Sequence, residues 1–416
     1  MSSSLPTEVL DYSVDLLKRL IAIPTVAPQG EHYEEVAELL ARELGSLGFS
    51  VEVIRVPSSY QEQNCKRASK EPRFIVYSWL GDVKTRVHFN GHYDVVPGGP
   101  GWETTDPFRP LLANDKLYGR GAIDMKGGIA AVIAAFKKNR KRMDSYPYRV
   151  EAAFVPDEEI GGDCGTGYLT RVVLKDNIPD FVLIPEPSGL KNPWHGHKGA
   201  VWVRVKVRGK TAHGSTPWLG RNAFLQASLL ALELQSVLSS KLAGAKSRHR
   251  IIPEEASRPT AMIGGVASVV GGGKTNQVPG EFEFSIDRRL IPEEHASSVY
   301  DELSDLVRLV SIKYGIESSV EPELLMDPAI NEPGLLYEAL KESSRKAGIE
   351  IGEPVVCPGG LDMWYYTTRG SKALAYGPSG ELAHAPDEHI ELGELRALIS
   401  IYSLMLDTLA AKIGHQ

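Results

Sequence analysis

Hydrophobic residues in the first part of the chain recur alternately at helical and at strand spacing. A helix is predicted over residues 7–22, with Thr7 as its cap. Its apolar stripe consists of Leu10, Val14, Leu17 and Ile21. Further helices are predicted over residues 31–47 and from about residue 127, and strands over residues 51–56, 74–78, 148–155 and 181–184. Strands that alternate with helices favour an α/β fold with a central mixed, mostly parallel sheet flanked by helices.

The pattern changes near residue 199, where apolar and polar residues alternate strictly. The inward positions are Val201, Val203, Val205 and Val207. Such alternation is typical of a strand with one face buried and one face in water. The elements that follow are predicted as a helix over 222–239, strands over 260–270 and 281–287, a helix over 293–314 and a strand over 317–323. This order predicts a small two-layer α+β domain.

The two patterns together predict three segments. Residues 1–198 form the first part of a larger domain, residues 199–325 are an inserted domain, and residues 326–416 return to complete the larger domain. The returning segment is predicted to contain helices over 335–347 and 393–413 and a strand over 373–376. The polar stretch 58–71 is predicted to be an exposed loop.

Composition excludes several classes of protein. The 416 residues are 42% hydrophobic and 24% charged with a net charge of −7, which argues against a nucleic-acid partner. No apolar run approaches the roughly 18 residues that a membrane span needs, and residues 1–6 carry no basic region of a signal peptide. Cys65, Cys164 and Cys357 lie at unrelated spacings, which predicts neither a disulfide framework nor a thiolate zinc site. Cys164 is expected to be a small packing residue, and a reducing cytoplasm is the simplest setting.

Candidate chemistry begins where a predicted strand runs into the turn GHYDVVP, residues 91–97. His92 and Asp94 are two positions apart and therefore point to the same side of extended backbone. An imidazole and a carboxylate at a strand end suit a metal or catalytic site, although a histidine hydrogen-bonded to its neighbour fits as well. Asp124 lies just ahead of an apolar helical run, which is another usual place for a ligand.

Further acidic residues and a histidine follow later strands. Asp157, Glu158 and Glu159 come after one strand and repel one another, so they persist there when a cation is close or when they lie in solvent. Glu186 follows the next strand, and His384 lies in a turn before the last helix. We expect these side chains at one edge of the sheet, where open α/β folds bind ligands. Two imidazoles and three carboxylates suit zinc, with cobalt or manganese as substitutes, and one bridging carboxylate would allow two ions.

Seven stretches in order resemble the motifs of the M20 metallopeptidase family: GHYDVVP, GRGAIDMKGG, DEEIGG, PEPSG, TAHGSTP, GGGKTNQVPG and HAPDEHI. The family includes acetylornithine deacetylase, succinyl-diaminopimelate desuccinylase, aminoacylase and bacterial glutamate carboxypeptidase. The resemblance covers nearly the whole chain. It implies that Asp124 bridges two zinc ions and is followed by a cis peptide bond. The implied ligand sets are His92, Asp124 and Glu186 for one ion, and Asp124, Glu159 and His384 for the other.

The same resemblance implies roles for residues beside the metal ligands. Asp94 would orient His92. Glu158 would be the general base, which deprotonates the attacking water and passes the proton to the leaving amine. A glutamate at position 186 resembles the deacetylase, desuccinylase and bacterial carboxypeptidase branch of the family more than the aminoacylase and carnosinase branch.

The inserted domain would be the family's lid or dimerisation domain. His213 would reach the partner subunit's site and stabilise the oxyanion, although an exposed turn histidine is the alternative. Asn276 and Arg289 would contact the substrate carboxylate and carbonyl, and either Arg288 or Arg289 fits a surface ion pair equally well. Gly360 would belong to a glycine loop that closes over the substrate carboxylate.

These inferences predict a cytoplasmic, homodimeric dizinc hydrolase of amino-acid biosynthesis. Its substrates would be N-acyl amino acids, as for acetylornithine deacetylase and succinyl-diaminopimelate desuccinylase. The alternative within the family is a metallo-carboxypeptidase or a dipeptidase. A non-catalytic homologue that binds or scaffolds is disfavoured, because every expected ligand and Glu158 are present. No nucleic-acid or membrane partner is expected.

Overall fold

The computed structural model describes residues 5–414, so residues 1–4, part of the segment on which the signal-peptide prediction rests, lie outside the described part. Backbone contacts divide the chain into two units. Unit 1 comprises Met1–Gly196, Asn331–Val355 and Leu361–Gln416, and unit 2 comprises His197–Ile330 and Val356–Gly360. The chain thus leaves unit 1, builds most of unit 2 and returns to unit 1, except for the short stretch Val356–Gly360.

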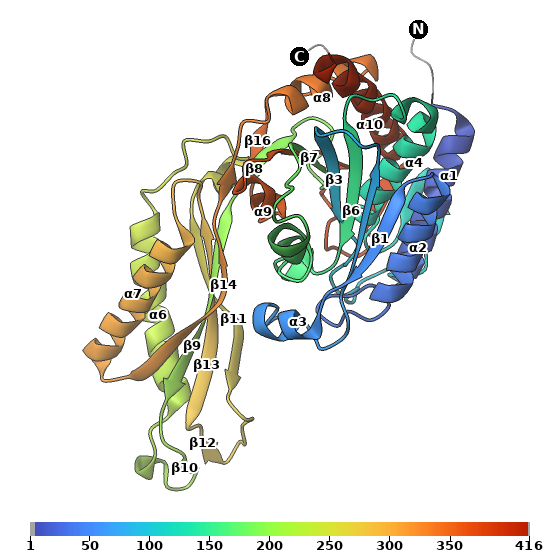
Figure 1. Cartoon of the computed structure of the whole chain (residues 1–416). Coiled ribbons are helices and arrows are strands. Elements are labelled where there is room, and N and C mark those ends of the chain that lie inside the picture. Colours follow the sequence, from blue (N-terminus) through green and yellow to red (C-terminus); the bar gives the residue numbers. More distant parts are fainter. Residues whose placement is uncertain (1–4, 415–416) are drawn as a thin grey trace. The chain divides into compact units, whose positions relative to one another are not determined.

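Unit 1 is built on a mixed sheet (Figure 1). Its strands are β1 (Ser50–Arg55), β2 (Phe74–Leu80), β3 (Arg86–His92), β6 (Arg149–Val155), β7 (Phe181–Ile184), β8 (Trp194–His197) and β17 (Lys372–Ala375). They lie in the order β1-β2-β6-β3-β7-β17-β8. Strands β6, β3, β7 and β17 pair in parallel, and the outer pairs are antiparallel. The expected mixed α/β sheet is confirmed, with parallel pairing at its centre.

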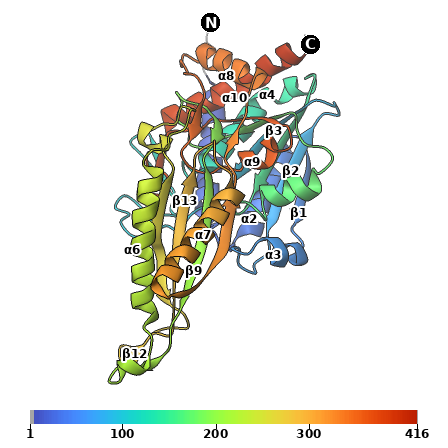
Figure 2. The same cartoon turned by 90° about the vertical axis from the view of Figure 1, so that its left-hand side faces the viewer.

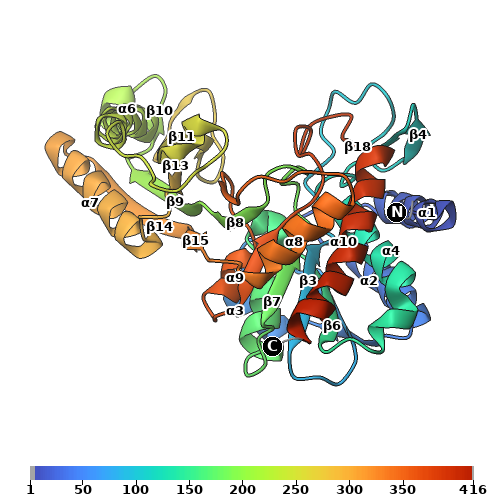
Figure 3. The same cartoon turned by 90° about the horizontal axis from the view of Figure 1, so that it is seen from above.

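Helices cover both faces of this sheet. One face carries α1 (Thr7–Ala22), α2 (Tyr33–Ser46), α4 (Lys126–Met143), α8 (Leu335–Lys346) and α10 (Leu392–Ile413), and α10 lies between α4 and α8 (Figure 3). These helices and the sheet enclose a hydrophobic core. Because side chains alternate along a strand, Val76 and Phe89 pack into this core, whereas Ile75 and Val155 pack on the opposite face of the sheet. Thr7 is the first helical residue and does not cap α1, because Pro6 occupies the cap position.

The prediction of an exposed loop over residues 58–71 was wrong. The segment contains helix α3 (Ser58–Asn64), and Gln61 on this helix is buried. Cys65, which follows α3, forms a disulfide with Cys164 across a sequence separation of 99. The inference that the cysteines form no disulfide was therefore also wrong, because tertiary packing and not local spacing brings this pair together.

Several short elements have no periodic pattern that sequence analysis can detect. In unit 1 they are β4 (Leu111–Ala113), β5 (Lys116–Tyr118), β18 (His389–Glu391), η1 (Glu158–Ile160) and α9 (Met363–Thr367). The short helix that the sequence predicts over about residues 167–174 is present as α5 (Thr166–Tyr168) and η2 (Leu169–Val173). Strands β18, β5 and β4 form a separate small sheet. Strands β15 (Ala329–Ile330) and β16 (Val355–Cys357) lie where the chain passes between the units.

Unit 2 is a two-layer domain, as the strict alternation predicts (Figure 2). Its sheet has the order β11-β13-β9-β14 and is antiparallel throughout. The strands are β9 (Gly199–Arg208), β11 (Thr260–Val269), β13 (Glu281–Leu290) and β14 (Glu317–Met326). Helices α6 (Ala223–Leu242) and α7 (Ala296–Tyr314) pack on the face that carries the four buried valines of β9. Ala200 pairs with Met326, so the first and last strands of this sheet begin and end side by side.

The remaining elements of unit 2 are short: β10 (Ala212–His213), η3 (Pro217–Leu219), η4 (Glu254–Ser257) and β12 (Gln277–Val278). Strands β10 and β12 pair with each other and place His213 opposite Gln277. Among the described residues, no helix is both long and apolar enough to cross a bilayer.

Candidate metal centre

Three neighbouring parallel strands of unit 1 end at the same edge of the sheet and carry candidate side chains there. His92 is the last residue of β3, and Glu158 and Glu159 open the turn η1 just beyond β6. His92 lies opposite Val155, so the ends of β3 and β6 are level. Glu186 follows the end of β7, the other neighbour of β3. This is the edge at which the sequence pattern predicted a site.

Two further candidates come from loops that reach the same edge. Asp124 lies just before α4, and the peptide bond that follows it is cis, as the family resemblance implied. The start of α4 lies against the end of β7, since a Cβ on Gly128 would be only 2.4 Å from the carbonyl oxygen of Pro185. His384 precedes β18 and has a φ of 65°, a left-handed backbone conformation that is uncommon for histidine.

The five predicted ligands converge into two groups that share Asp124. His92 Nε2 lies 3.1 Å from Asp124 Oδ1 and 3.7 Å from Glu186 Oε1. His384 Nε2 lies 3.2 Å from Asp124 Oδ2 and 3.0 Å from Glu159 Oε1. Ligand atoms at about 2.0–2.1 Å from a tetrahedral zinc ion are about 3.3 Å from one another. The donor atoms are therefore spaced as two ions would require, and the two oxygens of Asp124 face different groups.

The electrostatics of these groups also fit divalent cations. Hydrogen bonds to Asp124 and Glu159 raise the pKa of His384 to about 10. Burial, opposed by His92 and reinforced by the charge of Asp124, raises the pKa of Glu186 well above its usual range. Burial also raises the pKa of Glu159. Without a metal ion, protons on these side chains offset the crowding of negative charge, and a divalent cation would replace them.

Asp94 holds together two parts of the site. Its backbone carbonyl lies 3.0 Å from His92 Nδ1, and its carboxylate oxygen Oδ1 lies 3.5 Å from the same nitrogen. The carboxylate also accepts the backbone N–H groups of Glu158 at 3.2 Å and Glu159 at 3.1 Å. Asp94, whose side chain is fully buried, thus contacts both the imidazole at the end of β3 and the turn that follows β6.

Glu158 belongs to neither ligand group, although it is adjacent to Glu159. Burial raises the pKa of Glu158 well above its ordinary value. His92 opposes this shift, whereas the negative charges of Glu186 and Asp362 add to it. A carboxyl group whose pKa is shifted toward neutrality is suited to accept and return a proton.

Sequence analysis missed a buried ion pair that supports Asp124. Arg120 and Glu388 are 2% and 1% exposed, and Arg120 Nη1 donates to Glu388 Oε2 at 2.6 Å. Glu388 Oε1 accepts the backbone N–H of Ile123 at 2.8 Å and that of Asp124 at 3.2 Å. Arg120 also donates to the carbonyl of His384 at 3.2 Å. Glu388 was visible within the HAPDEHI stretch, but a charged residue in a turn gives no signal that it is buried.

Asp362 is a second buried carboxyl that sequence analysis did not assign. It follows the glycine loop that contains Gly360, and Thr166 Oγ1 donates to its Oδ2 at 2.5 Å. Burial raises the pKa of Asp362 to about 7. Its negative charge raises the pKa of both Glu158 and Glu186, so Asp362 contributes to the electrostatics of the centre.

The predicted oxyanion and substrate residues lie in unit 2. His213 is exposed on β10, where Ser215 N–H donates to its Nδ1 at 3.2 Å, and Gly214 N–H donates to the carbonyl of Asn276 at 2.7 Å. Arg289 forms an ion pair with Asp287 at 2.9 Å, whereas Arg288 is buried and paired with Glu294. Gly360 also belongs to unit 2.

Comparison with known protein sequences gives consistent matches along the chain. The sequence profile of peptidase family M20/M25/M40 matches residues 88–408. Succinyl-diaminopimelate desuccinylase of Acidovorax ebreus is 28% identical over 409 residues, which cover 96% of this chain and 98% of that enzyme. An uncharacterized metallohydrolase of Methanocaldococcus jannaschii is 26% identical over 415 residues, with coverage of 95% and 98%.

Solved structures share the fold at lower identity. The M20 family metallo-carboxypeptidase Sso-CP2 from Sulfolobus solfataricus superposes with a TM-score of 0.75 at 21% identity, covering 96% of this chain and 99% of that one. Human carnosine dipeptidase 1 gives 0.76 at 19% identity and 97% coverage of both chains. A dinuclear metal-binding M20 peptidase of Bacillus subtilis gives 0.66 at 14% identity, with coverage of 97% and 99%.

Proposed function

The chain belongs to peptidase family M20/M25/M40, and on that premise we propose that this hydrolase of amide bonds is a dinuclear metalloenzyme acting on N-acyl amino acids. The observation that carries the proposal is the pair of ligand groups that share Asp124. The succinyl-diaminopimelate desuccinylases among its relatives support the substrate class, and they cover almost the whole chain.

In this proposal each ligand group holds one ion. His92, Asp124 and Glu186 would hold the first, and Asp124, Glu159 and His384 the second. Zinc suits this mixture of imidazole and carboxylate donors, with cobalt or manganese as substitutes. When bound, such a pair of cations polarises the scissile carbonyl and lowers the pKa of a coordinated water molecule. The dinuclear centre named for the Bacillus subtilis relative supports two sites.

Glu158 is the proposed general base. It would accept a proton from the attacking water and return it to the leaving amine, so that one carboxyl group serves both halves of the reaction. Its raised pKa supports this role, as does its position outside both ligand groups. Asp94 would act through its contacts, since it orients His92 and fixes the backbone of Glu158.

His213 is the proposed donor to the oxyanion. Nδ1 of His213 lies 2.7 Å from Ser215 Oγ and 3.2 Å from Ser215 N, and in the tautomer in which Nδ1 accepts from Ser215 the proton is on Nε2. Nε2 is then able to donate to a developing negative charge. Asn276, Arg289 and Gly360 are proposed substrate contacts, and Arg289 would have to leave or share its ion pair with Asp287.

We further propose that unit 2 joins two copies of the chain. The exposed face of α6 carries Leu225, Leu229 and Leu232, which are 62%, 39% and 71% exposed. The adjoining edge strand β11 contains no charged residue, whereas the opposite edge strand β14 carries Pro322 and three glutamates. Natural sheets use proline and charge to block edge pairing. The contrast favours α6 and β11 as the surface of a homodimer, in which His213 would serve the partner's site.

A metallo-carboxypeptidase or dipeptidase is the second candidate, favoured by the fold shared with Sso-CP2 and carnosine dipeptidase 1. A role in amino-acid biosynthesis would follow from the desuccinylase-like substrate. The Cys65–Cys164 disulfide removes the redox argument for a cytoplasmic location, because stable disulfides are rare in most cytosols. A cytoplasmic location therefore stays a prediction from the sequence.

The test is a substrate panel on the zinc-loaded protein. N-acetylornithine and N-succinyl-diaminopimelate should be hydrolysed, whereas turnover of only dipeptides or N-blocked peptides would favour the second candidate. The substitution Glu158→Gln should lower kcat by about 100-fold or more while both metal ions stay bound. The exposed residue Glu38 provides the matched control, Glu38→Gln. Full activity of Glu158→Gln would contradict its role as the base.

A further inference from the structure

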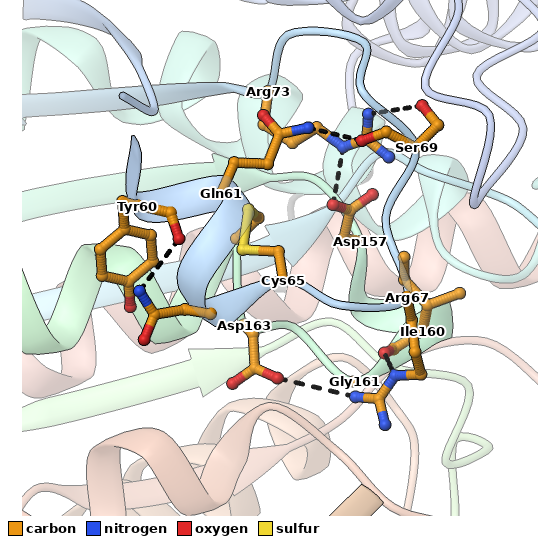
Figure 4. The surroundings of a disulfide bond; sticks show 12 residues. Tyr60, Gln61, Cys65, Arg67, Ser69, Arg73, Asp157, Ile160, Gly161 and Asp163 are labelled. Carbon is orange, nitrogen blue, oxygen red and sulfur yellow. Dashed lines mark hydrogen bonds and ion pairs between the residues drawn. A yellow bond between two sulfur atoms is a disulfide. The ribbon is translucent and has the colours of Figure 1, made fainter. Parts of the chain in front are cut away.

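The connection between β1 and β2 is much longer than the sheet requires. These strands are antiparallel neighbours, and such pairs are usually joined by about 2–5 residues. Here the chain runs from Arg55 to Phe74 through helix α3 and the disulfide residue Cys65. The extra chain packs against the loop after β6, residues 157–165, which carries Glu158 and Glu159 (Figure 4).

The connection holds this loop at its beginning. Arg73 is fully buried, and its Nε donates to Asp157 Oδ2 at 2.8 Å, one residue before Glu158. The remaining nitrogens of Arg73 donate to the carbonyls of Pro28 at 2.6 Å and Glu71 at 2.7 Å. Asp157 has a φ of 66°, so the backbone turns sharply at the residue that Arg73 anchors.

The connection also holds the middle and the end of the loop. Arg67 Nε donates to the carbonyl of Ile160 at 2.6 Å, directly after Glu159. Arg67 also lies 3.7 Å from Asp163. The disulfide then ties Cys65 to Cys164, and both cysteines are buried. On the other side of the loop, Asp94 accepts the N–H groups of Glu158 and Glu159.

We propose that residues 65–73 form a clamp that positions Glu158 and Glu159 for the reaction. Cys65, Arg67 and Arg73 are its positioning residues, and none of them is a metal ligand or a base. The inference rests on the proposed function of Glu158 as the base. Three attachments within one short loop, on both sides of the two glutamates, leave that loop little freedom to move the carboxyl groups. A clamp of this kind lowers the cost of orienting the base in each turnover.

The first test measures the loop without metal or substrate. Amide hydrogen exchange of residues 157–165 is followed by mass spectrometry in the metal-free protein. The double substitution Cys65→Ser, Cys164→Ser and the single substitution Arg67→Ala should each speed exchange of this loop about tenfold or more. Lys66→Ala is the matched control, because Lys66 is an exposed cation on the same segment. Unchanged exchange in both clamp variants would overturn the proposal.

The second test separates positioning from stability in the zinc-loaded protein, well below the unfolding temperature. Both clamp variants should lose about 10–100-fold in kcat with little change in KM, and Arg67→Lys should recover part of the loss. If the clamp variants have a lower unfolding temperature but unchanged kcat and unchanged loop exchange, the segment contributes only to stability and the proposal is overturned. If the cysteine variant fails to fold, Arg67→Ala still tests the proposal.

The two proposals fail in different ways. If Glu158→Gln is inactive but the clamp variants keep full kcat, the function stands and the clamp is wrong. If the zinc-loaded protein hydrolyses nothing in the panel, the proposed function is wrong, and the exchange data alone decide whether the clamp holds the loop.

Discussion

Removing the carboxylate of Glu388 should damage both the stability of unit 1 and its metal centre. This side chain is buried, pairs with Arg120 at 2.6 Å, and accepts the backbone N–H groups of Ile123 and Asp124. The substitution Glu388→Ala would leave a buried guanidinium without its counter-charge and two N–H groups without an acceptor. It would also release the backbone of Asp124, the proposed bridging ligand.

The expected size follows from these contacts. Breaking a buried ion pair by removing one partner costs about 3–5 kcal/mol, because the remaining charge stays desolvated. Glu388→Gln keeps an oxygen acceptor but loses the charge, so we expect a smaller loss of about 1.5–3 kcal/mol. The control is Glu38→Ala, which removes an exposed pair with Arg42 on α2 and should cost about 0.5 kcal/mol or less.

The assay is denaturant unfolding of the metal-free variants, followed by circular dichroism, with the slope of each transition compared as well as its midpoint. Zinc titration of the same variants gives the second readout, and affinity should fall in the order wild type, Glu388→Gln, Glu388→Ala. The reasoning is refuted if Glu388→Ala costs no more than Glu38→Ala and binds zinc as tightly as the wild type.

Three other predictions concern pH, metal and assembly. In the metal-free protein the raised pKa of His384, about 10, should add stability that is complete below about pH 6.5 and is lost as the pH rises toward 10. Urea unfolding with chelator should show this slope in the wild type and not in His384→Gln; equal slopes would contradict it. Chelation should abolish turnover, and zinc or cobalt should restore it. The affinity for metal should rise over the same pH range, because protons leave the ligands. Activity that survives exhaustive chelation would contradict the metal centre. Leu232→Glu on α6 should yield monomers in analytical ultracentrifugation, whereas Ile312→Glu on α7 should not; identical masses would argue against the α6 surface.

Much of the site could be predicted because its residues follow regular elements. His92 ends an apolar strand, and Glu159 and Glu186 lie within a few residues of the ends of two others; parallel strands place their ends at one edge. Asp124 and His384 lie in irregular loops. The sequence pattern placed them at the same edge as the strand residues, and the family resemblance divided the five residues into two ligand sets. The two-layer unit was predictable for the same reason as the strands, since the four valines of β9 alternate without interruption.

What could not be predicted depends on contacts between distant segments. Nothing near Cys65 indicates that Cys164 will be its partner, and the polar sequence around α3 is typical of an exposed loop. Glu388 and Arg120 are likewise charged residues in turns, and only the folded chain reveals that they are buried together. Strands of three residues, such as β5, are too short to show a period.

The side-by-side pairing of Ala200 with Met326 has a consequence for synthesis. Every strand of the unit 2 sheet is complete once residue 326 has left the ribosome, so all the strands of this sheet are available for pairing while the rest of the chain, including residues 356–360 of unit 2, is still being made. Unit 1 has to wait. Until β17 emerges, nascent β7 presents an unpaired edge on which a chaperone or a neighbouring chain can act, and His384 arrives later still.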